Sequence, residues 1–526
     1  MKTKYKILTF SLIFAIALGL NSCSEDFLQT VPTDAVSTEI ALGSTDNMML
    51  AINGIHRAMY AQNGQISNYA GYQFMIPTAE FAAGDALHST VGNGWFRAML
   101  QWIMHTDATR TDLSYIWFFN YNIIGSANNI INAAEELQMS DELHNVLGQA
   151  HTYRAWAHFN LVRYFGKAYM IGNPASDPGV PIMLATEPPY EGLARSTVQQ
   201  VYDQIKTDLT DAMAHFAGAS SRDDVSHLNI DVAKGIAAQV YLTIGDWANA
   251  AKYANEARQK YTLMSEAEYK SGFNSVNNPE WMWGSKMIQD QTSYFYSYFY
   301  YTSNNFNGSQ NRSNPKFMNH KLYDLMSETD YRRDLILKDC PSTLDAWDKG
   351  RNAGRYASKD EYTAAVKQYR AIVNNGNSHN MLPYLHIKLS QADGPTITPM
   401  DVIVMRAAEM YLIEAEALAR QNKNTEAQNV LFTLVSARDA GYAKSTNTGQ
   451  ALVNEILVQR RIELFLEGHR WFDLLRNDEA LNLEGTGADP DLYLEGFSQA
   501  KPSVNPKWLF LIPQRELDAN SNMVQN

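Results

Sequence analysis

The sequence predicts a mainly α-helical protein, in which a scaffold of helical hairpins carries a large irregular, loop-rich insert and a few short strands. Three observations lead to this fold class. Apolar residues recur at helical spacing in several long segments. Alanine-rich helix pairs occur twice, in residues 231–260 and 401–437. Between them, residues 271–399 are rich in Asn, Ser, Gly and Pro and contain few long periodic runs.

The first 22 residues have the organisation of a secretory signal. Three lysines precede an apolar run over residues 7–20, which is too short to span a bilayer as a helix. The run ends in Leu-Asn-Ser-Cys23, which resembles the lipobox of bacterial lipoproteins. In such proteins the cysteine is lipidated and becomes the first residue of the mature chain. The alternative is an ordinary signal peptide in which Cys23 is incidental.

The 526-residue chain is acidic and poor in cysteine. Residues 1–22 carry three lysines and no acid, so their removal changes the formal charge from −13 to −16. This charge gives no global affinity for nucleic acid. With only Cys23 and Cys340, no disulfide framework is expected, and Cys340 is predicted to be structural. The 29 Tyr and 10 Trp suit a half-wet binding surface, although a large exported protein could use them in packing alone.

The N-terminal half is predicted to contain three long helices. Apolar stripes of helical period run over residues 113–137 and 141–165, and Gly166 is placed to end the second helix. A loop rich in Pro and Gly follows. Ser196 or Thr197 can then cap a helix that continues through Phe216.

Two helix pairs form the predicted scaffold. In the first, residues 231–244 and 247–260 are joined by the tight turn Gly245-Asp246, and small alanines allow close approach. Residues 401–437 repeat this pattern. Both pairs resemble tetratricopeptide hairpins, although the full repeat consensus is absent, so unrelated antiparallel pairs are the alternative.

The insert is predicted to hold two short strands with aromatic faces. Alternation over residues 280–287 places Trp281 and Trp283 on one side, which favours a core position over ligand contact. Residues 293–301 are almost all aromatic. Alternate residues of a strand share one face, so a binding face or a packing face is expected here. Its members are Tyr294, Tyr296, Tyr298 and Tyr300.

Residues 459–476, QRRIELFLEGHRWFDLLR, form the strongest internal motif. Opposite charges three residues apart can meet on a helix, and Gly468 permits a break. The charged residues of this motif could act as a catalytic acid and base. The favoured interpretation is structural, with the arginines neutralising the acids. The acid/base candidates are Glu463, Glu467, His469 and Asp473, and the arginines are Arg460, Arg461, Arg470 and Arg476.

The motif resembles the signature of SusD/RagB-type lipoproteins, surface partners of outer-membrane importers in Bacteroidetes. Residues 23–28, 154–166, 405–416, 510–517 and 522–526 agree with the family as well, so the resemblance covers essentially the whole mature chain. It divides the chain into a signal peptide (1–22), an N-terminal SusD-like region (23–225), a tetratricopeptide-like helix pair (226–265), a loop-rich ligand-binding insert (266–400) and a C-terminal SusD/RagB region (401–526).

The resemblance implies a starch-utilisation-type nutrient-uptake lipoprotein that is not an enzyme. It would be anchored in the outer membrane by lipid on Cys23, and the acidic Glu25-Asp26 resembles the signal for the outer face. It would bind an oligosaccharide and deliver it to a SusC-like TonB-dependent transporter. No cofactor beyond the lipid and no nucleic acid partner are expected. A RagB-like peptide binder and a surface polysaccharide hydrolase are the alternatives.

The resemblance also places the ligand site on two regions, the loop over residues 84–95 and the aromatic insert. The ligand-binding candidates are Asp85, Trp95, Tyr294, Tyr296, Tyr298, Tyr300 and Asn304. No catalytic residue and no metal ligand is expected. Zinc-protease, phosphate-loop and serine-hydrolase motifs are absent from the sequence, and His151 and His158 lack a third ligand at metal spacing.

Overall fold

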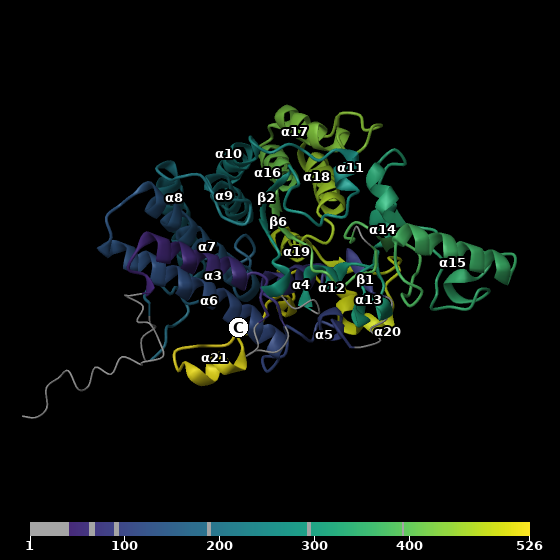
Figure 1. Cartoon of the computed structure of the whole chain (residues 1–526), viewed down its shortest axis with the longest axis horizontal. Coiled ribbons are helices and arrows are strands. Elements are labelled where there is room, and N and C mark those ends of the chain that lie inside the picture. The colour runs from purple at the N-terminus through teal and green to yellow at the C-terminus, as the bar shows by residue number, and fades with distance from the viewer. Residues whose placement is uncertain (1–40, 63–68, 89–93, 187–190, 292–295, 392–393) are drawn as a thin grey trace, which may run out of the picture.

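The computed structural model describes residues 41–62, 69–88, 94–186, 191–291, 296–391 and 394–526 (Figure 1). Among these residues helices predominate and the strands are short, which confirms the predicted fold class. Cys23 and Tyr294 lie outside the described residues. No helix within the described ranges is long and apolar enough to cross a membrane.

Four helices form one side of the molecule, at the left of Figure 1: α3 (Thr45–Ala58), α6 (Thr111–Ala133), α7 (Asp141–Phe165) and α8 (Val198–Ala217). Helix α7 packs along both α6 and α8. Its bounds are those predicted, and the Ser140 side chain caps it by accepting the N–H of Leu143 at 3.2 Å. Thr197 and Gln200 form a capping box at the start of α8.

Both predicted helix pairs are present and lie next to each other. The first is α9 (Ile230–Ile244) with α10 (Trp247–Arg258), and the second is α16 (Ala407–Arg420) with α17 (Asn424–Ser436). Helix α10 packs against α16, and α18 (Gly449–Glu463) also packs on α16. At the first turn Gly245 has a φ of +80°, which glycine adopts without steric cost.

The strand β2 (Trp281–Ser285) confirms that a strand lies within residues 280–287, and all of its residues are buried. It pairs antiparallel with β6 (Val402–Arg406), so the second helix pair begins with a strand and its helix starts only at Ala407. The expectation that 401–406 is helical is therefore wrong. Trp281 and Trp283 are each 1% exposed, as predicted for core residues.

A four-stranded sheet joins the insert to the N-terminal region. Its order is β1 (Ala86–His88), β3 (Lys316–Met318), β5 (Leu385–His386) and β4 (Ile336–Leu337), with antiparallel neighbours. Only β1 comes from the N-terminal region. Because β1 precedes Trp95 by a few residues, this pairing anchors the predicted ligand loop beside the insert.

The second predicted strand is wrong. Residues 298–302 form a short helix, α12 (Tyr298–Thr302), which the Ser297 side chain caps by accepting the N–H of Tyr300 at 3.2 Å. All of its residues are buried, so aromatic side chains that alternate in sequence pack around the whole helix. The N-cap serine and burial on all sides override the strand pattern.

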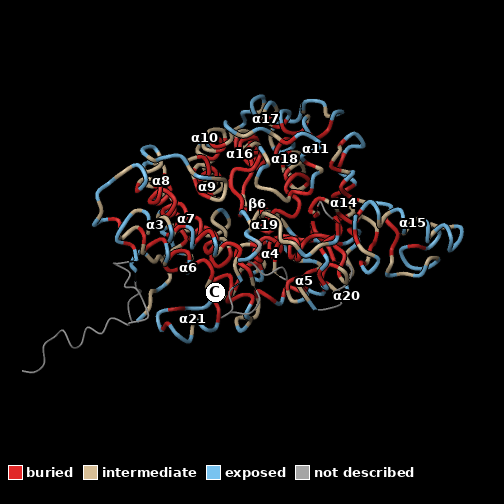
Figure 2. The backbone as a smooth tube through the Cα atoms, in the orientation of Figure 1, coloured by how far each residue is buried: buried red, intermediate tan, exposed pale blue. Residues whose placement is uncertain are grey.

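The remaining α-helices are spread over the rest of the molecule (Figure 1). They are α4 (Tyr72–Phe81), α5 (Arg97–Leu100), α11 (Glu266–Tyr269), α13 (Ser309–Ser313), α14 (His320–Tyr323), α15 (Lys359–Val373), α19 (Arg470–Arg476), α20 (Pro490–Tyr493) and α21 (Gln514–Ala519). Helix α15 extends to the right and is mostly exposed, whereas burial is concentrated through α7, α4 and α16 (Figure 2). Such a long helix was not predicted for the insert.

Candidate functional site

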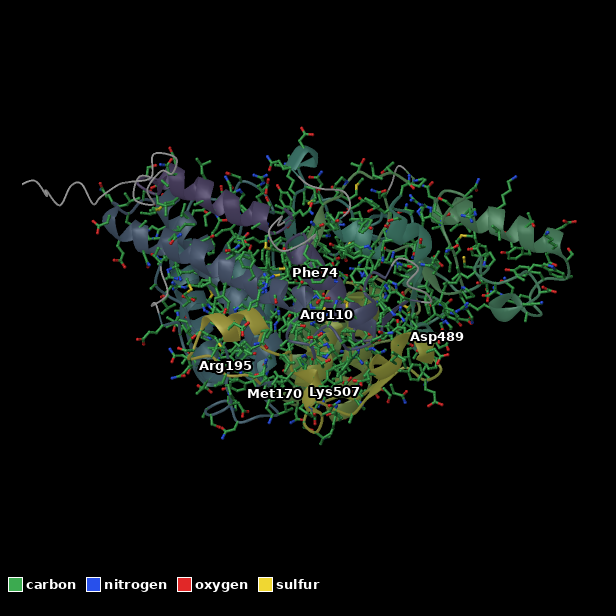
Figure 3. The ribbon with its side chains drawn as sticks, turned by 90° about the horizontal axis from the view of Figure 1, so that it is seen from below. Phe74, Arg110, Met170, Arg195, Asp489 and Lys507 are labelled. Atoms are coloured by element: carbon green, nitrogen blue, oxygen red, sulfur yellow. The ribbon has the colours of Figure 1, made fainter. Side chains whose placement is uncertain are left out.

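An open cavity of about 290 Å³ lies where α4, α5 and the start of α6 meet. Figure 3 labels two of its residues, Phe74 and Arg110, near the centre of the view. Its lining consists of Tyr69, Phe74, Gly94, Trp95, Phe96, Arg97, Ala98, Met99, Arg110 and Asp112. One of the sequence-predicted site residues, Trp95, is therefore part of the wall.

Aromatic rings from the two predicted regions meet at Trp95. The centroid of its ring lies 5.9 Å from that of Tyr296 and 5.9 Å from that of Tyr300. Trp95 and Tyr296 are half-buried, whereas Tyr300 is 2% exposed. The structure thus joins the N-terminal loop and the insert, with two rings at the surface and Tyr300 packed edge-on behind Trp95.

The backbone around Trp95 explains how a loop holds this ring in place. Gly94 has a φ of +80° and Phe96 a φ of +61°, so left-handed residues flank Trp95 on both sides. Phe96 is buried, with its ring centroid 5.0 Å from that of Phe81 and 5.5 Å from that of Tyr301. The inward Phe96 therefore fixes the turn that leaves Trp95 half-exposed.

Another part of the cavity lining combines an ion pair with an aromatic pair. Arg110 donates two hydrogen bonds of 2.9 Å to the two carboxylate oxygens of Asp112, and this contact raises the pKa of Arg110. The Tyr69 ring packs against that of Phe74 in a tilted arrangement, with a centroid distance of 4.2 Å, and burial raises the pKa of Tyr69. The cavity therefore offers flat apolar faces beside a fixed pair of opposite charges.

Three other predicted residues are buried and make contacts inside the protein. Asp85 is 2% exposed and pairs with Arg461 at 2.6 Å; burial alone would raise its pKa, but the arginines around it hold the pKa below its usual value. Tyr298 donates from its hydroxyl to the carbonyl of Leu466 at 2.6 Å. Asn304 donates two 2.8 Å hydrogen bonds to backbone carbonyls of Lys316 and His386.

These contacts change how the predicted residues are interpreted. Asp85 and Tyr298 tie their regions to the C-terminal motif, and Asn304 bonds within the insert, so the three residues support the site without lining the cavity. Tyr69, Arg110 and Asp112 line the cavity and were not predicted. The sequence carried little indication that Arg110 and Asp112 belong to a site, because Arg-Thr-Asp is also typical of the start of a helix.

The profile of the SusD family matches residues 247–526, which is more than half of the chain. The chain belongs to the SusD family. A second profile, described as starch-binding associating with outer membrane, matches residues 51–242.

Relatives of this SusD family protein match over nearly its whole length. A SusD-like protein of Formosa agariphila is 24% identical over 99% of both chains. One of Bacteroides ovatus is 21% identical over 90% of this chain and 82% of its own. The solved structure titled SusD-like carbohydrate binding protein, from Bacteroides vulgatus, has a TM-score of 0.72 at 22% identity and covers 91% of this chain and 97% of its own.

A SusD superfamily structure from Bacteroides thetaiotaomicron also has a TM-score of 0.72, at 23% identity, and covers 92% of this chain and 99% of its own. These structures show that the fold is shared.

In this SusD family protein the motif over 459–476 is a buried charge network. The Glu463 carboxylate meets Arg406 at 2.6 Å, Arg332 at 2.8 Å and Arg438 at 3.2 Å. Burial would raise its pKa, but the three guanidinium groups hold that pKa well below its usual range. Glu467 pairs with Arg406 at 2.7 Å and with Lys388 at 2.6 Å.

The neutralising partners differ in part from those predicted. Arg460 and Arg476 do pair with Asp473, each at 2.8 Å, whereas Arg461 and Arg470 contact Asp85 in the N-terminal region. The helix breaks between α18 and α19 as Gly468 suggested, with a φ of +91°. Because these acids are buried and ion-paired, the structural interpretation of the motif holds and the acid/base interpretation loses support.

Proposed function

We propose that this protein is a cell-surface lipoprotein that binds an oligosaccharide at the Trp95 cavity and delivers it to a SusC-like TonB-dependent transporter. The observation that carries the proposal is the meeting of Trp95 and Tyr296 beside the Arg110–Asp112 ion pair in an open cavity. The starch-binding description of the matched family and the carbohydrate-binding title of a structural relative support the same ligand class.

The chemistry of this wall fits a sugar. A pyranose ring has an apolar C–H face that packs against a flat aromatic ring, and a rim of hydroxyl groups that both donate and accept hydrogen bonds. Arg110 and exposed Arg97 supply donors, and Asp112 supplies acceptor oxygens. The ion pair holds the Arg110 and Asp112 side chains in place before the ligand arrives, which lowers the ordering cost of binding.

The same wall favours binding without hydrolysis. Glycoside hydrolysis by the usual mechanism needs two carboxyl groups about 5–10 Å apart, one of them free to give a proton. Among the described lining residues of the cavity, Asp112 is the carboxylate, and both of its oxygens accept hydrogen bonds from Arg110. We therefore assign no catalytic residue.

Glycan binding can be tested with matched tryptophan variants. Trp95→Ala should weaken binding of the best oligosaccharide from a glycan panel at least tenfold in isothermal titration calorimetry, because it removes the stacking face. Trp247→Ala is the control: Trp247 is also half-buried, but it lies on α10 under the Arg420 guanidinium at 4.9 Å. Affinity for that glycan should then be unchanged.

Three results would contradict the proposal. Equal affinities of the Trp95→Ala and Trp247→Ala variants would mean that the glycan does not bind at the Trp95 cavity. Binding confined to a peptide library would replace the sugar by a peptide. Turnover of a polysaccharide by the purified protein would make it a hydrolase.

Anchoring and partnership need separate tests. Metabolic labelling with a fatty acid should mark the wild-type protein and not Cys23→Ala, and protease added to intact cells should release the wild-type protein. An affinity-tagged chain should copurify a TonB-dependent barrel from detergent-solubilised outer membranes. Survival of the protein until lysis, or purification without a barrel, would contradict the corresponding part of the proposal.

A further inference from the structure

A second cavity, of about 250 Å³, lies beside the C-terminal end of α7 and shares no lining residue with the Trp95 cavity. Its wall comes from the last turn of α7, the segments over residues 166–171 and 502–509, and Leu475 of α19. Figure 3 labels Met170 and Lys507, which adjoin this lining in sequence, at the lower edge of the view. This cavity is therefore separate from the proposed glycan site.

The wall of this second cavity is mostly apolar, and its charged groups are positive. Apolar surface comes from both segments, for example from Ile171 and Val504, and from Leu475. Arg163 and exposed Lys167 are the charged side chains, and no carboxylate occurs among the described lining residues. Such a wall is complementary to an anion that also has an apolar part.

The Arg163 guanidinium has aromatic neighbours in place of an acidic partner. Its Cζ atom lies 4.0 Å from the ring centroid of Phe159 and 4.0 Å from that of Phe472. Nη2 donates to the side-chain oxygen of Asn160 at 2.6 Å, whereas Nε is buried without a partner. Nη1 has no hydrogen-bond partner among the described residues, and the side chain is partly exposed. Nη1 is therefore available to a ligand in the cavity.

No described carboxylate lies within ion-pair distance of Arg163. Glu409 acts on it from farther away and accepts two 3.0 Å hydrogen bonds from Gln239. Burial lowers the pKa of Arg163, because no close anion offsets the loss of hydration. By contrast, Arg476 pairs with Glu416 at 2.6 Å, and its pKa is raised despite burial. A carboxylate from outside the chain would give Arg163 the partner that Arg476 already has.

The loop that forms one wall of the cavity is held in place from its outer side. Ser503 donates from its backbone N–H and from its hydroxyl to the two carboxylate oxygens of Asp478, each at 2.7 Å. The indole N–H of Trp508 donates to the carbonyl of Ala500 at 2.6 Å. These contacts form the cavity before a ligand arrives, which lowers the ordering cost of binding.

We propose that the cavity beside α7 binds a small organic carboxylate with an apolar body. The carboxylate accepts from Nη1 of Arg163, with the Lys167 ammonium on the solvent side, and the apolar body packs on Ile171, Leu475 and Val504. Phosphate and sulfate fit this wall less well, because they have more acceptor oxygens to satisfy and no apolar part. This site is independent of glycan binding at Trp95.

The test uses hexanoate and its neutral counterpart hexanamide, each titrated into the purified protein and followed by saturation-transfer difference NMR. Hexanoate should bind with a Kd of about 1 mM or tighter, and hexanamide at least tenfold more weakly. Arg163→Met should weaken hexanoate binding at least tenfold, because it removes the charged donor and keeps an apolar side chain. Lys507→Gln is the control, because Lys507 is next to the lining but pairs with Glu495 at 2.6 Å. Its affinity for hexanoate should change less than twofold.

A second variant keeps the test valid if Arg163→Met does not fold. Val504 is 65% exposed, so Val504→Asp should fold normally while it places a negative charge at the cavity rim. This change should also weaken hexanoate binding at least tenfold, and thermal unfolding checks that each variant is folded. Absence of hexanoate binding, equal binding of hexanamide, or unchanged affinity in the folded Arg163 and Val504 variants would overturn the proposal.

Discussion

The aromatic cavity and the buried charge network both come from conspicuous sequence features, yet they differ in their access to solvent. Trp95 and Tyr296 are half-buried beside an open cavity. Arg406 and Glu463 are at most 1% exposed, and ion pairs surround both. The first region is open to solvent, so a ligand can reach it. The charged groups of the second region are buried and already paired within the protein.

The comparison shows that density of functional residue types does not identify a functional site. Residues 459–476 carry more charge than the cavity, but those charges join α18, α19, β6 and the N-terminal region. The cavity has fewer polar groups, and it keeps them at an accessible surface. We therefore expect substitutions in the network to change stability and substitutions in the cavity to change binding.

The largest expected effect is the loss of a network charge. Arg406→Met leaves Glu463, Glu467 and Glu280 short of a shared partner in a buried site. Removing one partner of a buried ion pair costs about 3–5 kcal/mol. The free energy of unfolding from chemical denaturation should fall by that amount. A loss below about 1 kcal/mol would mean that the network is not structural.

Acidification should also destabilise the network. Glu463, Glu467 and Asp473 have pKa values held below their ordinary values by guanidinium partners, despite burial. Their stabilisation is present above the ordinary pKa values, 4.5 for the two glutamates and 3.8 for Asp473, and is lost as pH falls below these toward the folded values. The unfolding free energy should fall steeply below about pH 4.5. A flat profile from pH 5 to 3 would contradict this assignment.

Glu80 should contribute in the opposite direction. Its carboxylate accepts the N–H groups of Gly468 and His469 at 2.8 and 2.9 Å, but burial and nearby Asp85 raise its pKa to about 7. The protonated folded form is therefore favoured, and stability is lost as pH rises from about 4.5 to 7. Glu80→Gln should reduce that loss, measured as the difference in unfolding free energy between pH 5 and 7. An unchanged difference would contradict the raised pKa.

A smaller effect is expected at the cavity ion pair. Arg110→Gln removes the guanidinium that orients Asp112, so the affinity for oligosaccharide should fall several-fold. The thermal midpoint should change little, because Arg110 is partly exposed at the cavity and an ion pair in contact with solvent contributes about 0–1 kcal/mol. Calorimetry and thermal unfolding of the same sample would separate the two quantities. A large loss of stability with unchanged affinity would mean that Arg110 has a structural role and does not contribute to binding.

The smallest effect is expected at Tyr296. Tyr296→Phe keeps the ring beside Trp95 and removes only the hydroxyl, so the affinity should change less than threefold if the ring face is the binding element. Tyr296→Ala should weaken binding further. Equal losses in both variants would show that the hydroxyl contributes most of the contact.

The helical periodicity of apolar residues and the capping residues predicted the helices of the scaffold well. The bounds of α7, the Thr197 cap and the turn at Gly245 all follow from local preferences that the folded chain keeps. The run that becomes α12 could not be predicted, because alternating aromatics fit a strand or a buried helix equally well and tertiary packing decides.

The site was predicted by region rather than by residue. Trp95 and Tyr296 meet as expected, because β1 pairs with β3 and anchors the loop beside the insert. Which side chains face the cavity depends on packing: Asp85 turns inward because Arg461 and Arg470 surround it, while Arg110 and Asp112 arrive from the start of α6.

The most direct test of the central claim is a crystal structure of the protein with the oligosaccharide that it binds most tightly. The account predicts one sugar ring stacked on Trp95, near Tyr296, with hydroxyl groups hydrogen-bonded to Arg110 or Asp112. The network around Glu463 should be unchanged and should make no contact with the ligand. A glycan bound elsewhere, with no contact to Trp95, would contradict the account.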